Sequence, residues 1–381
     1  MERTVSCADV SDSENSARGM RERARLSRRG WTVLLSGILV LVFVLLGTLV
    51  RVPYVVLGPG PTFDILGKVD GEPVVRVDGH ETYDTEGELR MVTVSFSDDV
   101  TLFGALGMWL SGRDALAPRD AYFDPGQSEE EFQEHSQQLF RRSQSEAVVA
   151  ALRQLGYPTK VVVGGVVPDT PAAEKPSDTF TAGDRIVAVE GTKVDTAKEV
   201  QRALRGSEPG DTVSITLSDA DASEGSREPA KSEQRRVEIT LGERPNSERA
   251  GGFIGIKLNE QAAVPFDIDI SLEDVGGPSA GMMFALAIVD QLQQGSLTSG
   301  HAIAGTGTID TRGRVGEIGG IAFKLTAASE AGAESFLVPE GNCPAAVETA
   351  PDDLRLIKVG TLDEAVQALQ RLDSGMSVPT C

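Results

Sequence analysis

An uncharged apolar run at residues 31–50 is the feature that most limits how this 381-residue chain can fold. As one helix it is about 30 Å long, which matches the hydrocarbon core of a bilayer. Arginines are concentrated just before it, between Arg18 and Arg29, so the positive-inside rule keeps the N-terminus in the cytoplasm. We therefore predict a cytoplasmic basic tail at residues 1–30, a single transmembrane helix at 31–51 in the cell membrane, and an extracytoplasmic body.

A cleaved signal peptide is the competing interpretation of this run. Its apolar core would be shorter and would end in a small-residue cleavage site. Here the apolar run continues through Leu49 and Val50 to Arg51, and Val52 follows. This continuation favours an uncleaved anchor.

The charge and the cysteines limit the partners of the body. The chain has a net charge of −21, although its first 30 residues are net basic, and so acidic a surface is not expected to bind nucleic acid. Cys7 falls in the predicted cytoplasmic tail, and the sequence leaves the pairing of Cys343 and Cys381 open. Cysteine and histidine do not occur at zinc-binding spacing, so we expect no metal and no cofactor.

The segment at residues 277–281 (GPSAG) has the composition of a turn that presents a nucleophile. Residues 264–272 alternate apolar and polar side chains like a strand, and residues 282–289 form an apolar run typical of a buried helix. A helix that begins near Ser279 places its free backbone N–H groups beside that hydroxyl, where an oxyanion would develop. The glycines, among them Gly277, let a substrate backbone approach closely.

A serine hydroxyl needs a base, and Lys324 is the candidate. It follows the apolar residues 321–323, and a water-poor setting favours the neutral form of a lysine. The α/β-hydrolase elbow is excluded, because none of the histidines (His80, His135 and His301) stands where a triad histidine would follow the serine. A turn that caps a buried helix is the remaining alternative.

Two blocks of the sequence resemble the proteolytic domain of Lon-type serine proteases. The first is the GPSAG segment, and the second runs from Thr306 to Lys324 and matches the family pattern T-G-x-x-x-x-R-G-x-V-x-x-I-G-G-x-x-x-K. The resemblance implies that Ser279 is the nucleophile, Lys324 the general base and Thr306 a hydroxyl that orients the lysine. The family commonly has an aspartate three residues before the serine, whereas this chain has Gly276.

Complete Lon proteases also contain an ATPase module. The pattern G-x-x-x-x-G-K-[ST], which forms a phosphate-binding loop, does not occur in this sequence. We therefore expect proteolysis without ATP, restricted to segments that are already extended.

Residues 158–244 resemble a bacterial PDZ domain. The resemblance rests on residues 168–173 (PDTPAA) and 182–191 (AGDRIVAVEG), followed by a helical segment at 196–204. It implies a module that binds an extended peptide as an additional strand between a sheet edge and a helix. These bounds contain no clear G-L-G-F carboxylate loop, so the peptide-binding residues stay unassigned and a purely structural role is the alternative.

Together these features predict an α+β, multidomain protein. After the transmembrane helix we expect a juxtamembrane α/β region at 52–157, the β-rich PDZ-like module at 158–244 and a C-terminal Lon-protease-like α/β domain at 245–374. The predicted function is a membrane-anchored, ATP-independent serine endopeptidase that cleaves extracytoplasmic or membrane-proximal protein and peptide substrates. A non-catalytic scaffold or peptide-binding protein is the alternative, and the sequence leaves open whether the chain forms a homo-oligomer.

Overall fold

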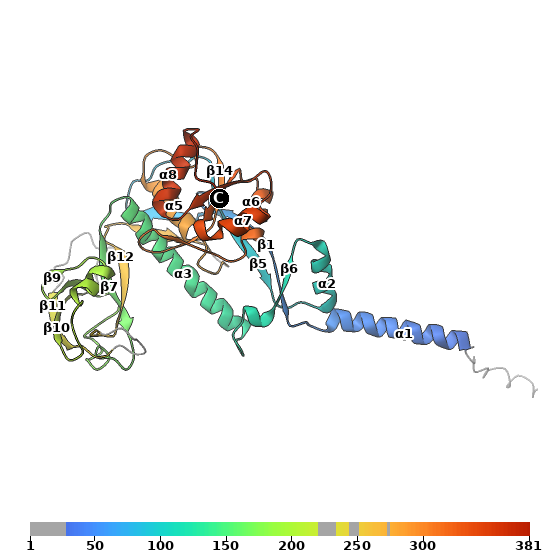
Figure 1. Ribbon diagram of the computed structural model, residues 1–381, viewed down its shortest axis with the longest axis horizontal. Coiled ribbons are helices and arrows are strands. Elements are labelled where there is room, and N and C mark those ends of the chain that lie inside the picture. Colours follow the sequence, from blue (N-terminus) through green and yellow to red (C-terminus); the bar gives the residue numbers. More distant parts are fainter. Residues whose placement is uncertain (1–27, 220–233, 244–250, 273–274) are drawn as a thin grey trace, which may run out of the picture.

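The computed structural model describes residues 28–219, 234–243, 251–272 and 275–381 (Figure 1). An apolar helix, α1 (Arg28–Leu49), projects away from the folded body, and Gly47 is its one buried residue. Within the described ranges, α1 alone is long and apolar enough to cross a membrane, and its 22 residues extend about 33 Å. The predicted cytoplasmic tail lies outside the described residues, except for residues 28–30.

A six-stranded mixed sheet forms the centre of the body, with the strand order β18-β17-β14-β5-β1-β6. Its strands are β1 (Tyr54–Asp64), β5 (Glu88–Ser97), β6 (Ala115–Pro118), β14 (Ala302–Gly305), β17 (Ser335–Pro339) and β18 (Arg355–Val359). β14 runs parallel to β5 and β17, whereas β1 is antiparallel to β5 and β6. Because β5 hydrogen-bonds to β14, the region predicted as a separate unit at 52–157 belongs to the same sheet as the C-terminal domain.

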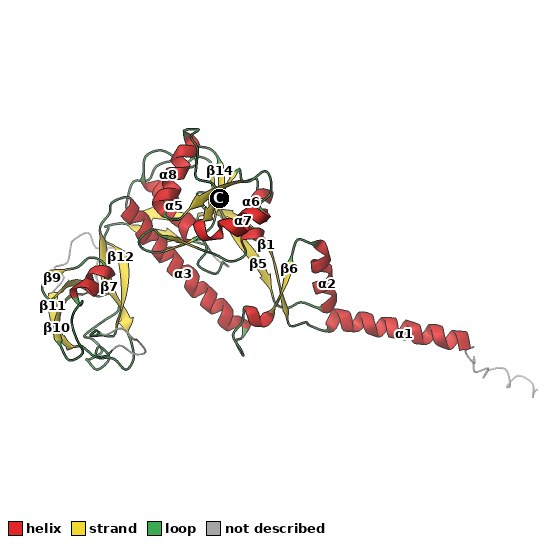
Figure 2. Ribbon diagram, viewed as in Figure 1, coloured by secondary structure: helices red, strands yellow, loops and turns green. Residues whose placement is uncertain are grey.

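Helices cover both faces of this sheet (Figure 2). On one face the core contains residues of α3 (Glu129–Gln154), α5 (Gly281–Leu292) and α8 (Leu362–Asp373), and on the other it contains residues of α6 (Ile321–Glu330) and α7 (Cys343–Thr349). On β17, Leu337 packs on the first face and its neighbours Phe336 and Val338 on the second. Strands buried on both faces are apolar throughout, as parallel strands usually are.

The helix predicted after the GPSAG segment is α5, and it lies inside the core. Every residue of α5 except Gln291 is buried. A helix that is apolar all round must be enclosed by other elements, and here α3 and α8 enclose it together with the sheet. The residues just before α5 are therefore held by the most rigid part of the body.

A second sheet forms a separate lobe, with the order β11-β10-β8-β7-β12 and β9 beside β8. Its elements are β7 (Thr159–Val166), β8 (Arg185–Val189), β9 (Thr192–Lys193), α4 (Ala197–Ala203), β10 (Thr212–Ser218), β11 (Gln234–Thr240) and β12 (Ile256–Ala262). β12 pairs with β7 along its whole length. The boundary predicted between residues 244 and 245 therefore falls inside this lobe, which continues to Ala262.

The remaining elements are short and connect these layers. They are α2 (Leu102–Ser111), the 3-10 helices η1 (Arg119–Ala121) and η2 (Glu340–Asn342), and the strand pairs β2 (Lys68–Val69) with β3 (Glu72–Pro73), β4 (Val75–Asp78) with β13 (Asp267–Ile270), and β15 (Thr308–Ile309) with β16 (Val315–Gly316). After the second lobe, the chain forms β13, which pairs with β4, and then enters α5.

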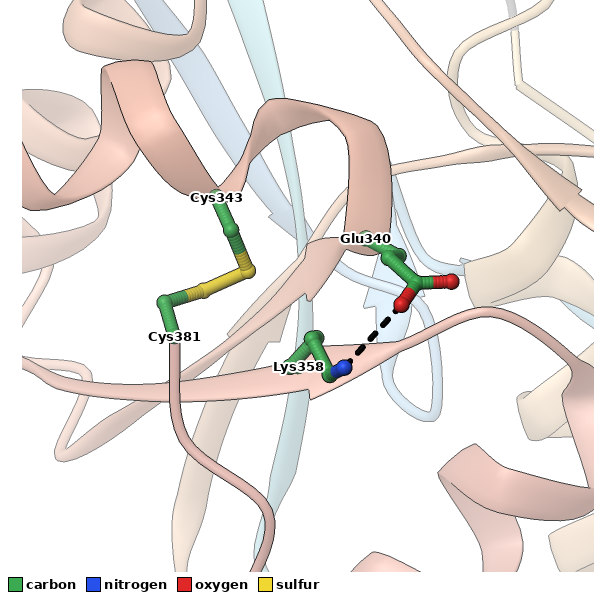
Figure 3. Close-up of a disulfide and its surroundings, with 4 residues drawn as sticks. All are labelled: Glu340, Cys343, Lys358 and Cys381. Atoms are coloured by element: carbon green, nitrogen blue, oxygen red, sulfur yellow. Dashed lines mark hydrogen bonds and ion pairs between the residues drawn. A yellow bond between two sulfur atoms is a disulfide. The ribbon is translucent and has the colours of Figure 1, made fainter.

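A disulfide joins Cys343 to the C-terminal residue Cys381 (Figure 3). Nearby, the backbone N–H of Lys358 on β18 donates to the carbonyl of Pro379, with 3.0 Å between the N and O atoms. The Lys358 side chain also pairs with Glu340, with 3.0 Å from Nζ to Oε1. The C-terminal segment is thus tied to α7 and lies along β18, the edge strand of the sheet, which protects that edge from pairing with other chains.

We expect removal of this disulfide to destabilise the body. The two cysteines are 38 residues apart, and the loop-closure model gives about 4 kcal/mol for a loop of that length. Replacing both cysteines by serine should lower the free energy of unfolding in denaturant titrations by about 2–4 kcal/mol. A reducing agent should destabilise the wild type by the same amount and leave the variant unchanged. Equal stability of the variant and the oxidised wild type would contradict this expectation.

Candidate active site

Ser279 lies in the turn between the second lobe and α5, two residues before the helix begins at Gly281. Its carbonyl oxygen accepts two hydrogen bonds, one from the Thr306 hydroxyl at 3.0 Å and one from the Gly307 N–H at 2.8 Å. Gly277 has a φ of 82°, a left-handed conformation that a residue with a side chain rarely adopts. The backbone at Ser279 is therefore fixed by the loop that follows β14 and by a glycine turn.

Lys324 lies in the first turn of α6, which begins after Gly320, and its side chain points into the body with only 3% of its surface exposed. Its Nζ atom lies 2.7 Å from the Ser279 hydroxyl and 3.0 Å from the Thr306 hydroxyl. A third polar atom, the carbonyl oxygen of Val92 on β5, lies 3.5 Å away. The structure thus brings together the three side chains that the sequence predicts for the site.

Burial changes the chemistry of this lysine. All three polar partners of Nζ are uncharged, so they do not offset the loss of hydration that the charged form suffers. Desolvation lowers the pKa of Lys324 from its usual value to about 8. At neutral pH roughly one site in ten then holds a neutral amine, which is able to accept the proton of the adjacent hydroxyl.

A cleft of about 930 Å³ opens at Ser279. It is lined by β5 from Met91, by the two residues that follow this strand, by the start of α3 and by residues 275–276. Apolar side chains dominate the lining, among them Phe63, Met91, Phe96, Phe132, Val275 and Phe323. Ser279 and Lys324 both line the cleft, so Ser279 is accessible from it while most of the lysine side chain is buried.

The glycine that replaces the usual aspartate has a structural explanation. The N–H of Gly277 donates to the carbonyl of Ser136 on α3, at 2.9 Å. A side chain at position 276 would collide with the Ser136 hydroxyl, because α3 approaches the backbone there. A side chain at Gly276 therefore fits only if the Ser136 side chain moves, because α3 lies close to this backbone.

The sequence analysis missed several residues that build the site. The Ser143 hydroxyl on α3 donates to the carbonyl of Pro278 at 2.9 Å, and Val92 supplies the third polar partner of Lys324. The Asn342 side chain donates to and accepts from the backbone of Ile318 at 2.9 and 3.0 Å, which holds the loop before α6. Most of these residues lie far from Ser279 in the sequence and belong to no motif, so no local pattern could have identified them.

Histidine and metal chemistry find no support in this geometry. His80 contacts the carbonyl of Glu81, and His301 contacts the carboxylate of Glu334. No histidine lines the cleft at Ser279. Among the residues that the structure describes, histidine, cysteine and acidic side chains do not gather into a group of three that could hold a metal ion.

Two family models match this chain. Residues 270–371 match the Lon protease (S16) C-terminal proteolytic domain, and residues 130–223 match the PDZ domain. The C-terminal part of the chain therefore matches a Lon-type proteolytic domain, and a PDZ domain precedes it. The PDZ match begins within α3 and ends before β12, whereas the hydrogen-bonded sheet includes β12.

Curated Lon proteases are similar to part of this chain. The Lon protease of Campylobacter concisus is 39% identical over 98 residues, which are 24% of this chain and 12% of that protein. The archaeal Lon protease of Methanocaldococcus jannaschii is 36% identical over 104 residues, 27% of this chain and 15% of that protein. The chain thus matches less than a sixth of either relative.

The solved structures that are similar to part of this chain include PDZ domains. The PDZ domain of an SdrC-like protein from Listeria monocytogenes is 26% identical, with a TM-score of 0.20, and covers 26% of this chain and 85% of that chain. The TM-score is too low to support an argument about the fold. The PDZ assignment therefore rests on the family model.

We expect the rate of hydrolysis to rise with pH as Lys324 loses its proton. Because burial lowers the pKa of Lys324 to about 8, kcat/KM should increase through a single ionisation near that pH, well below the range of an exposed lysine. The profile should be measured on an unstructured fluorogenic peptide, under single-turnover conditions that isolate the chemical step. A rate that stays constant between pH 6 and about 10 would exclude lysine as the base.

Proposed function

We propose that this protein is a serine endopeptidase anchored in the membrane by α1, with Ser279 as the nucleophile and Lys324 as the general base. The observation that carries the proposal is the 2.7 Å contact between the Lys324 amine and the Ser279 hydroxyl at the floor of an apolar cleft. The fall in the pKa of Lys324 and the match to the Lon proteolytic domain both support it.

The proposed reaction begins when the Ser279 hydroxyl attacks a peptide carbonyl and transfers its proton to the Lys324 amine. The backbone N–H groups of Ser279 and Ala280, just before α5, lie at the positive end of that helix, where they stabilise the oxyanion of the tetrahedral intermediate. Lys324 then protonates the leaving amine, and the same residue activates a water molecule that releases the acyl-enzyme. Thr306 contacts both partners and holds Nζ toward the serine.

The compartment and the energy source follow from other features. A disulfide between Cys343 and Cys381 favours an oxidising compartment outside the cytoplasm, in agreement with the arginines that precede α1. Because the sequence contains no phosphate-binding loop, we propose that hydrolysis needs no ATP and is limited to extended segments.

We also propose that the second lobe binds substrate tails along β12. This strand is last in the sheet order, and its outer edge has no strand partner among the described residues. α4 lies beside it, because the N–H of Ala197 donates to the Glu260 carboxylate at 2.8 Å and Leu258 belongs to the same apolar cluster as Val200. A PDZ domain takes a peptide as an additional strand in such a groove between strand and helix.

The segment just before β12 is the candidate for the carboxylate loop. Residues 252–255 read GFIG, and they lie outside the bounds within which the sequence analysis sought this loop. Gly255 has a φ of 92°, and its backbone approaches the Thr170 hydroxyl so closely that a side chain would not fit. With the later domain boundary, this segment is our candidate for the element that the resemblance lacked.

Substitution of the two catalytic residues tests the proposed chemistry. Ser279→Ala and Lys324→Ala should each lower kcat by at least about a thousandfold on an unstructured peptide, and the double variant should lose little more, because the two residues act as one unit. Thr306→Val should lower kcat less, and its matched control Thr306→Ser should retain most of the activity. Thermal unfolding of every variant shows whether the fold is preserved.

A covalent serine-reactive probe separates this function from a scaffold. The wild type should be labelled at Ser279 and Lys324→Ala should be labelled slowly. If Ser279→Ala keeps a turnover close to that of the wild type, the proposed dyad is wrong.

A charge placed in the β12 groove tests substrate selection. Leu258→Glu should raise KM about tenfold or more for a substrate with a long unstructured C-terminal tail, because tail binding raises its local concentration at Ser279. Hydrolysis of a short peptide should be unchanged. Lys257→Glu, on the exposed face of the same strand, is the matched control and should affect neither substrate. Equal losses on both substrates in a folded Leu258→Glu protein would leave the lobe with a structural role.

A further inference from the structure

Two short apolar helices of this chain have opposite surroundings. α5 is enclosed by the core, whereas Ala105 is the one buried residue of α2 (LFGALGMWLS). A helix that is apolar all round is stable in a soluble protein only when other elements cover it. Among the described residues, little covers α2, so its exposure requires an explanation other than packing within this part of the chain.

The exposed side chains of α2 share one face. Leu102, Leu106, Trp109 and Leu110 are spaced by four, seven and eight residues, and their exposed fractions are 44%, 48%, 63% and 70%. Ala105 lies beside this stripe, three residues after Leu102, and packs in a small cluster with Val56 and Val100. α2 is therefore fixed to the body near its first turns, and it presents an exposed apolar surface beside that contact.

This apolar surface is continuous with the predicted membrane span. Phe103 of α2 packs on Gly47 and Phe43 of α1, with 6.0 Å between the centres of the two phenylalanine rings. The N–H of Leu102 donates to the carbonyl of Val50 at 3.1 Å. α2 thus begins beside the last two turns of α1, and Figure 1 shows that it runs away from the axis of α1.

We propose that α2 is a second membrane-binding element, which inserts the face of Leu102, Leu106, Trp109 and Leu110 into the lipid interface where α1 leaves the bilayer. The proposal rests on the membrane anchoring proposed above. With 10 residues α2 is about 15 Å long, half of what a bilayer-spanning helix needs, so it lies at the surface of the hydrocarbon core.

The residues around α2 agree with this position. Tryptophan is enriched at membrane interfaces, and Trp109 lies on the exposed face. Charged residues flank the helix at both ends, with Asp99 paired to Arg51 before it and Arg113 paired to Glu330 after it. These pairs keep the ends of α2 in water while its apolar face contacts lipid.

Attachment at both α1 and α2 sets the height of the active site above the membrane. β5 contacts Lys324 through the Val92 carbonyl. Eight residues later, Val100 packs with Ala105 at the base of α2. At about 3.3 Å per residue this distance is roughly 26 Å. The cleft runs along β5 and past its end at Ser97 to Asp98 and Asp99. Membrane-tethered substrates are therefore cut where their chain lies about eight extended residues or more from the bilayer.

Fluorescence of the full chain in lipid vesicles tests the insertion without any assay of activity. The chain has two tryptophans, so Trp31→Phe leaves Trp109 as the single reporter. In phosphatidylcholine vesicles, its emission should be quenched by lipids brominated at shallow positions of the acyl chains more than by those brominated at deep positions. Soluble iodide should have little effect. Loss of shallow quenching in the additional variant Leu110→Asp is expected.

Two results would overturn the proposal. Strong quenching of Trp109 by iodide, without quenching by brominated lipid, means that α2 stays in water. Quenching by neither agent means that protein covers the helix, either a second copy of this chain or another partner. Trp109→Phe, which leaves Trp31 near the other end of α1, is the control that shows whether the anchor itself is in the bilayer.

A tethered substrate tests the consequence for substrate choice. The substrate carries its cleavage sequence at varied distances from its own transmembrane helix. The wild type should cut it poorly below about eight residues, whereas Leu110→Asp should cut it about tenfold more slowly and depend less on the distance. A soluble peptide should be cut at the wild-type rate by both. Val347→Asp, an exposed apolar residue on α7, is the matched control.

The outcomes distinguish the proposed position of α2 from the proposed chemistry. If Leu110→Asp behaves like Val347→Asp on the tethered substrate, α2 does not set the height of the site. If no substrate is cut in a Ser279-dependent manner, the proposed chemistry fails, and the quenching of Trp109 still decides whether α2 contacts lipid.

Discussion

The chemistry of the contact between Lys324 and Ser279 depends on the exclusion of water from around the Lys324 amine. An amine serves as a base near neutral pH only where its charged form is poorly hydrated, and burying such a group without a carboxylate partner is costly. The sheet, α6 and the Thr306 loop provide that environment, with 3% of the lysine exposed and three neutral oxygen atoms within 3.5 Å. The chain accepts this cost in stability because the site requires it.

The surrounding fold holds both residues by elements that are distant in sequence. α3 contacts the Ser279 turn through Ser136 and Ser143, and it reaches the second lobe through Arg153, which pairs with Glu260 at 3.0 Å. Glu260 on β12 also accepts a hydrogen bond from Thr311, in the loop between β15 and β16, at 2.9 Å. A tail bound at β12 would therefore lie next to a residue in direct contact with both the proteolytic domain and α4.

Local patterns singled out the three side chains that the structure brings together, and long-range pairing limited the rest. Ser279, Thr306 and Lys324 lie in two blocks whose spacing alone is informative, and α5 follows from an apolar run. The contribution of β5 to the central sheet could not be predicted, because its hydrogen bonds to β14 join residues more than 200 positions apart. β12 was assigned to the wrong domain for the same reason. Its partner β7 is the first strand of the lobe in the sequence, whereas β12 is the last. Gly276 became understandable only when α3 was seen to occupy the neighbouring space.

In the sequence, the second lobe separates the early strands of the central sheet from the late ones. The strands of this sheet are therefore synthesised in two groups. β1 and β5 leave the ribosome early, yet β14, β17 and β18, together with all three site residues, follow the entire second lobe. Because β5 has no parallel partner until β14 arrives, the nascent chain holds an incomplete sheet while the lobe folds independently around its own core. The cleft is therefore assembled last, when nearly the whole body has been synthesised. A chain built in this order has no complete cleft until its C-terminal part has been made and has joined β5.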